Sequence, residues 1–202
     1  MKPNKFATTL QPIHDLLAKR WSPRAFDANK KVSREQIISM LEAARWAPSC
    51  FGDEPWRYIV WDKNTGQAAW ENAFACLDES NQKWVKNAPV ILASLANSVF
   101  DHNGKTNRWA QHDTGAASMA LVLQAEALGL AAHQMGGFDA AKLRAIFSIP
   151  EQFTPMAMIA VGYQADANIL ESEIQSRELA ARTRKPMESR FFEGAWGAAL
   201  NK

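Results

Sequence analysis

The sequence predicts an α+β fold built in layers, with more helices than strands. Most of the chain carries apolar residues at helical spacing, whereas only a few short apolar segments are typical of strands. No Gly-x-Gly-x-x-Gly motif follows any of these segments, which argues against a Rossmann dinucleotide-binding domain. With 202 residues, of which 47% are hydrophobic and 22% charged, the chain can bury one substantial core, so we expect a single domain over residues 1–202.

The first elements are helices. A cap at Thr8 or Thr9 begins a helix that runs to about Arg20, because the next residues place apolar side chains on one face and Pro23 prevents continuation. Residues 33–36 (Ser-Arg-Glu-Gln) form a capping box, which predicts the start of a second helix that stops before Pro48.

The middle of the chain alternates between strands and helices. We expect a strand over residues 57–62, bounded by the turn-forming residues 63–66, and helical turns over residues 67–77 and near Gln82. The continuous apolar run over residues 89–95 is more typical of a buried strand than of a helix.

The second half begins with a long alanine-rich helix. We expect Asp113 to cap it and Gly129 to end it in the left-handed conformation. Strands over residues 131–135 and 155–162 then flank a helix that Asp139 caps and that reaches about Phe147. The tail from residue 165 has weak periodicity, yet it carries three aromatic residues that we expect to be buried against something: Phe191, Phe192 and Trp196.

Bulk properties exclude several classes of function. A formal net charge of +2 is too small to indicate nucleic-acid binding. The N-terminus lacks the apolar core of a signal peptide, and no apolar stretch is long enough to span a bilayer, so we expect a cytoplasmic protein without a membrane partner. Neither the two cysteines, Cys50 and Cys76, nor the four histidines show metal-ligand spacing, so we expect no metal.

The segment over residues 47–57, Ala-Pro-Ser-Cys-Phe-Gly-Asp-Glu-Pro-Trp-Arg, has the composition of a binding loop. Its two prolines stiffen the ends, and Gly52 lets the backbone approach a ligand closely. Cys50 lies in this loop, but no neighbouring histidine marks it as a nucleophile, which favours a packing or ligand-contact role.

Two basic clusters lie at opposite ends of the chain. Arg20, Ser22 and Arg24 surround Pro23, and Arg182 and Arg184 show the same alternate spacing. Guanidinium forks and hydroxyls match phosphate oxygens, so both clusters are candidates to bind a phosphate, although either alone is equally typical of a solvated surface.

Five elements in order resemble those of the FMN-dependent nitroreductases. They are Arg-x-Ser-x-Arg at 20–24, the Pro-Ser loop at 48–56, the helix over 113–130, the Met-Gly-Gly-Phe-Asp turn at 135–139 and the basic pair at 182–184 followed by Pro186. The resemblance implies a central, mainly antiparallel sheet flanked by helices, with the C-terminal segment exchanged across a homodimer and FMN at the interface.

The resemblance also implies which residues bind FMN. The basic clusters, the loop and the turn supply this set: Arg20, Trp21, Ser22, Arg24, Pro48, Ser49, Cys50, Gly52, Glu54, Asn81, Met135, Gly136, Gly137, Arg182 and Arg184. In this reading Arg24 and Asn81 face the O2 and N3 edge of the flavin, and a backbone N–H of the Gly-Gly pair faces N5. The pair is alternatively a tight strand-to-helix turn.

The function implied is NAD(P)H oxidation by hydride transfer to flavin N5, followed by reduction of a nitroaromatic, quinone or related small acceptor in the same slot. Phe51 and Trp109 are candidates to line the acceptor side, although both are also candidates for the core. Gly52 and Glu54 stand where the family has Asn and Gln, and Trp84 where some members have a cation. A flavin-binding or sensing protein without turnover, and oxidase or dehalogenase chemistry on the same fold, remain alternatives. The acceptor and the choice between NADH and NADPH are left open.

Overall fold

The computed structural model describes residue 3 and residues 5–200, and these form seven α-helices, three short 3-10 helices and four strands. The α-helices are α1 (Asp15–Lys19), α2 (Arg34–Arg45), α3 (Gln67–Phe74), α4 (Glu79–Val85), α5 (Ala110–Ala127), α6 (Ala140–Phe147) and α7 (Ser172–Leu179). The strands are β1 (Trp56–Asp62), β2 (Val90–Asn97), β3 (Ala131–Met135) and β4 (Phe153–Gly162), and the 3-10 turns are η1 (Cys50–Gly52), η2 (Ala167–Ile169) and η3 (Met187–Ser189).

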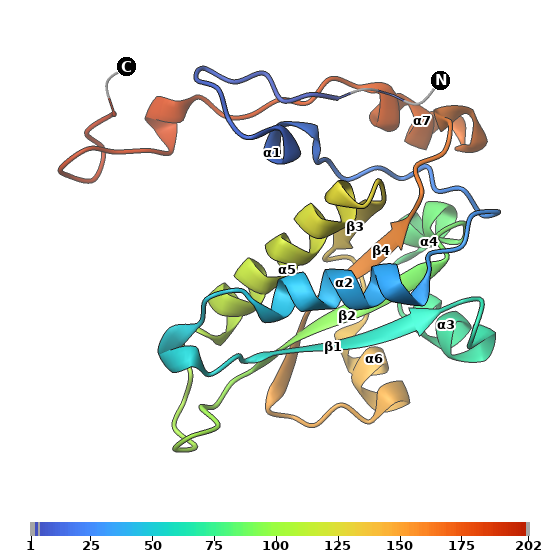
Figure 1. Ribbon diagram of the computed structural model, residues 1–202, viewed down its shortest axis with the longest axis horizontal. Helices are drawn as coiled ribbons and strands as arrows, with labels where there is room; N and C mark the ends of the chain where they lie inside the picture. The colour runs from blue at the N-terminus through green and yellow to red at the C-terminus, as the bar shows by residue number, and fades with distance from the viewer. Residues whose placement is uncertain (1–2, 4, 201–202) are drawn as a thin grey trace.

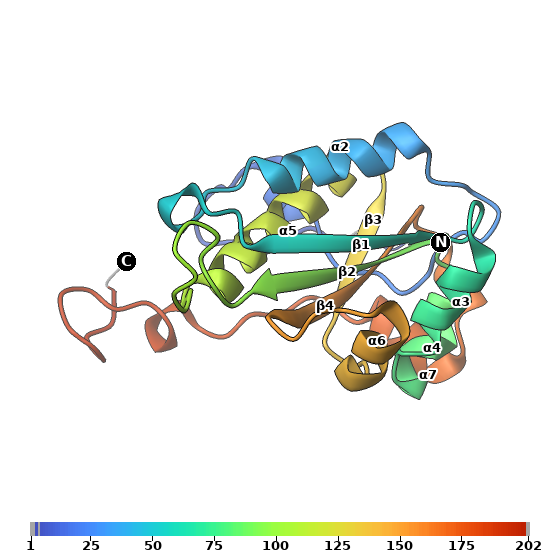
Figure 2. The ribbon, with the colours of Figure 1, turned by 90° about the horizontal axis from the view of Figure 1, so that it is seen from below.

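One antiparallel sheet organises the molecule, with the strand order β1-β2-β4-β3. Every residue of β2 is buried, as the unbroken apolar run predicts for a strand covered on both faces. Helices α2 and α5 cover one face of the sheet, and α3, α4, α6 and α7 lie toward the other (Figures 1 and 2). The predicted α+β class with an antiparallel sheet between helices is therefore confirmed.

Side chains of β2 pack into two separate cores, one on each face of the sheet, because successive side chains of a strand point to opposite faces. Ile91 and Ala93 pack into a core with Trp70 of α3 and Trp84 of α4. Val90 and Leu92 pack instead with residues of α2 and α5, of which Leu121 is fully buried. The two helical layers are thus each fixed to the sheet by their own apolar contacts.

Local signals placed most elements correctly. Ser33 accepts from the backbone N–H of Gln36 while the Gln36 side chain accepts from the backbone N–H of Ser33, so the capping box begins α2 as predicted. Asp139 caps α6 through the N–H of Lys142, and Gly129 ends α5 with a φ of +72°.

Three expectations about helices were wrong. The first helix begins at Asp15 rather than near Thr8, because Pro12 favours extended geometry before it and His14 caps the helix by accepting from the N–H of Leu16. Helix α5 begins at Ala110, one turn before Asp113, whose side chain is used elsewhere. Helix α7 was not expected, since its sequence has weak apolar periodicity.

The described C-terminal residues 186–200, here called the C-terminal arm, extend away from the layers (Figures 1 and 2). Trp196 is 92% exposed and Phe191 is 55% exposed, and Phe192 packs only on Trp196 among the aromatic contacts of the described residues. The expected burial of these aromatics is therefore not found within a single chain. Nor does any described helix combine the length and the apolar character needed to cross a bilayer.

Candidate functional site

The two basic clusters meet, although 158 or more residues separate them in sequence. Arg20, Arg182 and Arg184 line one hollow of about 290 Å³ together with Thr183 and residues of the N-terminal segment and α5: Ala7, Thr8, Thr9, Ile13, Leu17 and Met119. Arg182 is held there because its Nη1 donates to the carbonyl oxygens of Lys5 and Ala18, at 2.6 and 3.0 Å. The N-terminal and C-terminal segments that supply these residues run side by side (Figure 1).

This hollow concentrates positive charge. Burial lowers the pKa of Arg20, and the charges of Arg182 and Arg184 lower it further, while Glu126 on α5 acts in the opposite direction. Burial and the charge of Arg184 also lower the pKa of Arg182. No carboxylate belongs to the described residues that line the hollow, so the three guanidinium groups form a donor set suited to a multiply charged anion.

The C-terminal end of the segment between Arg20 and Arg24 is held by hydrogen bonds to a buried carboxylate. Glu178 of α7 is fully buried and accepts from the backbone N–H groups of Arg24, at 3.0 Å, and Ala25, at 3.2 Å. Its Oε2 also lies 3.9 Å from Nη1 of Arg24. Arg24 therefore has an ionic partner within the chain, whereas the Nη1 of Arg20 donates only weakly to Ser22 Oγ, at 3.4 Å.

His133 supports the same segment. This residue of β3 donates from Nδ1 to the carbonyl oxygen of Pro23, at 2.8 Å, and its ring lies 4.6 Å from that of Trp84. Burial lowers the pKa of His133 to about 4, the hydrogen bond to Pro23 opposes this shift, and the charges of Arg24, Arg20 and Arg177 reinforce it. The imidazole is consequently neutral under the basic cluster at neutral pH.

The partly buried His133 predicts an acid-sensitive fold. Its pKa of about 4 lies below the ordinary 6.5, so the unfolded chain binds the proton first and stability is lost as the pH falls from 6.5 toward 4. We expect this residue to remove about 3 kcal/mol from the free energy of unfolding over that interval. Urea unfolding at several pH values should show a shallower pH dependence in His133→Gln, and the same slope in both proteins would contradict the prediction.

The Pro-Ser loop is held in a strained conformation. Phe51 and Glu54 adopt left-handed backbone angles, with φ of +56° and +48°, on either side of Gly52 at +64°. The loop is tied down at Cys50, whose N–H donates to Asp113 Oδ2 at 2.9 Å, and at Ser49, whose Oγ accepts from the N–H of Glu54. Left-handed geometry costs a non-glycine residue about 1 kcal/mol or more, and such strain gathers at ligand-binding loops.

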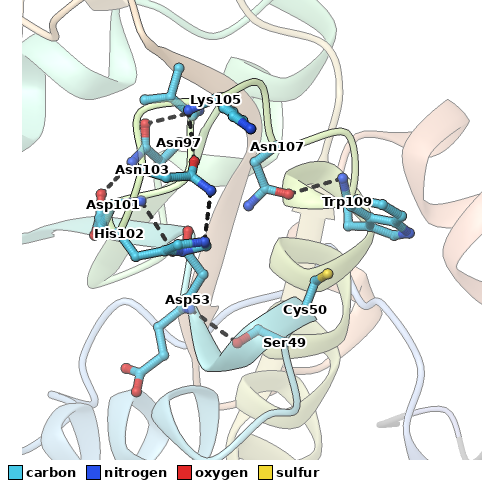
Figure 3. Close-up of polar contacts among 12 residues, drawn as sticks. Ser49, Cys50, Asp53, Asn97, Asp101, His102, Asn103, Lys105, Asn107 and Trp109 are labelled. Atoms are coloured by element: carbon cyan, nitrogen blue, oxygen red, sulfur yellow. Dashed lines mark hydrogen bonds and ion pairs between the residues drawn. The ribbon is translucent and has the colours of Figure 1, made fainter.

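A second loop packs against this one (Figure 3). Residues 98–109 approach it through Asp53, whose Oδ1 accepts from the backbone N–H of Asp101, at 3.1 Å, and lies 3.4 Å from His102 Nδ1. Phe51, Gly52, Asp53, Asp101 and His102 line an open cavity of about 560 Å³. Phe51 lies at the edge of this cavity and is 81% exposed. Trp109 is turned away from Asp53 and His102 (Figure 3).

The Gly-Gly turn is shaped by its neighbours. The side-chain amide of Asn81 donates to the carbonyl oxygen of Gly137, at 3.0 Å, and a Cβ at Gly137 would lie 2.6 Å from Asp78 Oδ2. Gly137 is therefore required by packing against α4, as in the alternative reading of a tight turn. The space over Gly136 is open, with nothing within 4 Å of a Cβ placed there. Met135, by contrast, is buried in the core.

The remaining expected residues are distributed over both regions. Lys5 lies over the ring of Trp21, at 4.5 Å from its centroid, next to the basic hollow. Pro48 is exposed at the start of the loop. The hollow and the cavity share no lining residue, so one chain does not bring all the expected FMN residues together. Among the described residues, no group of three or more His, Cys, Asp or Glu is placed to hold a metal ion.

Sequence reasoning missed the residues that support the site. Asp113 was assigned to a helix cap, but it is buried and receives Cys50 N–H and contacts His112, at 2.9 Å. Glu178 and His133 act on a segment more than a hundred residues away. Only the general rule that charged residues in apolar surroundings need partners hints at such roles.

Comparison with known proteins gives consistent matches. The "Uncharacterized 15.4 kDa protein in ask 5'region" of Mycolicibacterium smegmatis is 36% identical over 149 residues, covering 71% of this chain and 99% of that protein. The oxygen-insensitive NAD(P)H nitroreductase of Enterobacter cloacae is 24% identical over 193 residues, covering 76% of this chain and 89% of that protein.

A solved structure described as an oxidoreductase containing FMN superposes with a TM-score of 0.88 at 34% identity, covering 95% of this chain and 96% of that one. The model of the nitroreductase family matches residues 17–163. This range is well over half of the sequence and contains the first four of the five ordered motifs, and it confirms the resemblance that they predicted. The chain belongs to the nitroreductase family.

Proposed function

We propose that the chain is an FMN-dependent NAD(P)H oxidoreductase that reduces nitroaromatic, quinone or related small acceptors. As a nitroreductase family member it is an oxidoreductase, and relatives named as an NAD(P)H nitroreductase and as an FMN-containing oxidoreductase support the two cofactors. The observation that carries the proposal for this chain is the hollow lined by three guanidinium groups without a lining carboxylate. For a nitro compound the overall step is ArNO₂ + NAD(P)H + H⁺ → ArNO + NAD(P)⁺ + H₂O.

The donor set fits the phosphate of FMN. Arg20, Arg182 and Arg184 offer planar donors that match phosphate oxygens, and each charge-assisted hydrogen bond is worth about 1.5–3 kcal/mol. Glu178 and His133 hold the backbone of the Arg-x-Ser-x-Arg segment, so Ser22 is carried on a rigid support. Arg24, already partnered by Glu178, does not line the hollow, and we propose that it faces the O2 and N3 edge of the flavin.

The loop and the turn are suited to the flavin ring. When bound, FMN supplies a ring that takes a hydride from NAD(P)H and passes two electrons to the acceptor. The chain would position that ring: Gly136 leaves open space, Asn81 fixes the turn behind it, and the Ser49–Cys50 backbone is locked by Asp113. We propose that Phe51 lines the acceptor side.

We further propose a homodimer in which each site takes the basic hollow from one subunit and the Pro-Ser loop from the other. The separation of hollow and cavity within one chain supports this arrangement. So do the exposed aromatics of the C-terminal arm, and the outer face of α5, where Gly115 and Met119 are exposed. Within each subunit we propose that residues 1–202 act as one domain, since both ends of the chain build one hollow.

An absorption spectrum tests the proposal. Purified protein is expected to show the two visible bands of oxidised flavin, to bleach on anaerobic addition of NADPH or NADH, and to recover its colour when a quinone or nitroaromatic is added. Protein that binds no flavin would contradict the proposal. Flavin that is reduced but never reoxidised by any such acceptor would favour a binding or sensing role instead.

A further inference from the structure

We propose that the open cavity beside Phe51 selects planar aromatic acceptors that carry a positive charge, in preference to anionic ones. This inference rests on the proposed function, because it assigns the substrate class of the same site. The cavity of about 560 Å³ is lined by an aromatic residue, a glycine, two aspartates and a histidine, and none of the lining residues is a lysine or arginine.

Asp53 supplies the negative charge of this cavity. Its side chain is only 3% exposed, and its Oδ2 is buried without a hydrogen-bond partner among the described residues. Its Oδ1 accepts from the N–H of Asp101 and contacts His102. Among the described residues, no lysine or arginine forms an ion pair with Asp53. A buried carboxylate with one unpaired oxygen is costly to keep, and a cationic group placed at the cavity mouth would reduce that cost.

The other charges near the cavity do not cancel this field. Asp101 pairs with Arg57, whose Nη2 lies 3.2 Å from Oδ2, so this aspartate and arginine neutralise one another at the rim. The Asn97 side-chain amide also donates to Asp101 Oδ1. The charge of Asp53 therefore remains in excess among the groups lining the cavity as long as His102, 3.4 Å from its Oδ1, is neutral. A second loop holds Asp53 in position (Figure 3).

Phe51 supplies the aromatic surface. It is 81% exposed although its backbone is held at a φ of +56°, which any non-glycine residue adopts only at a cost. Its ring makes edge contacts with Phe100 and His102, each at 5.8 Å between centroids, so its orientation is set from one side while the other side stays open. A planar cation fits such a surface, since aromatic faces attract both rings and positive charge.

Three acceptors that share a nitrobenzene ring but differ in charge test the preference. We would compare 4-nitrobenzyltrimethylammonium, 4-nitrobenzyl alcohol and 4-nitrophenylacetate, in which a methylene group insulates the nitrobenzene ring from a cationic, neutral or anionic substituent. With the FMN-loaded enzyme, kcat/KM for the cation should exceed that for the anion by about tenfold or more, and the ratio should shrink as salt is raised. Equal values, or a preference for the anion, would overturn the inference.

The variant Asp53→Asn tests the assigned residue, because it keeps the shape of the side chain and removes the charge. The cation-to-anion ratio should fall by about fivefold or more. Glu71→Gln, which removes one exposed carboxylate on α3, is the matched control and should keep the ratio. An unchanged ratio in Asp53→Asn would overturn the assignment. If the variant does not fold, the salt dependence in the natural protein decides the matter. Turnover of the neutral acceptor reports on the proposed function separately, since it does not depend on the charge preference.

Discussion

Replacing Arg20 and Arg184 together by alanine should weaken FMN binding by at least about a hundredfold. Each guanidinium lines the hollow, and each charge-assisted hydrogen bond to a phosphate contributes about 1.5–3 kcal/mol, so losing two corresponds to a factor of about 10² to 10⁴. The measurement is a titration of apoprotein with FMN, followed by flavin fluorescence, together with the flavin content of the protein as purified.

Riboflavin distinguishes a lost phosphate site from general damage. It lacks the phosphate, so its affinity should change little in the double variant, and the preference for FMN over riboflavin should collapse. The matched control replaces Lys31 and Arg34 by alanine, which removes the same charge from two exposed positions outside the hollow and outside the C-terminal arm. Unchanged FMN occupancy in the Arg20 and Arg184 variant would reject the phosphate assignment.

Removal of residues 186–202 should convert the proposed dimer to a monomer and lower kcat/KM by at least about a hundredfold. The cut leaves Arg182 and Arg184 in place but removes aromatic surface that a single chain leaves uncovered, including Trp196. Stable interfaces depend on a few such aromatic anchors, and a reactive site that is completed by a second subunit loses its geometry when that subunit leaves. Light scattering after size-exclusion chromatography, combined with steady-state kinetics, measures both effects.

A milder variant separates the two roles of the C-terminal arm. Trp196→Ala should keep a folded chain and shift the monomer–dimer equilibrium toward monomer at low concentration, with activity following the dimer fraction. Circular dichroism checks that the truncated chain is still folded. A truncated protein that stays dimeric and fully active would show that the C-terminal arm has no part in assembly.

Sequence reasoning succeeded where a structural signal is local. The strand β2 is a continuous apolar run, and the start of α2 is set by Ser33 and Gln36, which lie three residues apart. It failed for the helix near Thr8, where Pro12 sets a competing preference, and for Asp113, which is a good cap by composition but serves a loop more than sixty residues earlier.

In the candidate site, too, sequence reasoning predicted the features that ordered motifs record and missed those that depend on long-range contacts. Ordered motifs predicted the family and the meeting of the two basic clusters, since a bound phosphate requires several cations. They did not predict that Arg24 is paired with Glu178 or that Gly137 is needed for packing against Asp78. Both contacts join segments that are far apart in sequence, and no local pattern records such contacts.

The basic hollow joins Arg20 to Arg182 and Arg184, and Arg182 is fixed by carbonyl groups at Lys5 and Ala18. During translation this arrangement cannot exist until residues 182–184 have been synthesised and have left the ribosome, whereas the buried residues of both cores lie within residues 25–174. FMN capture is thus a late event in the life of each new polypeptide. The vitamin-derived ligand cannot guide the early stages of folding, which must rely on the sheet and its two cores alone.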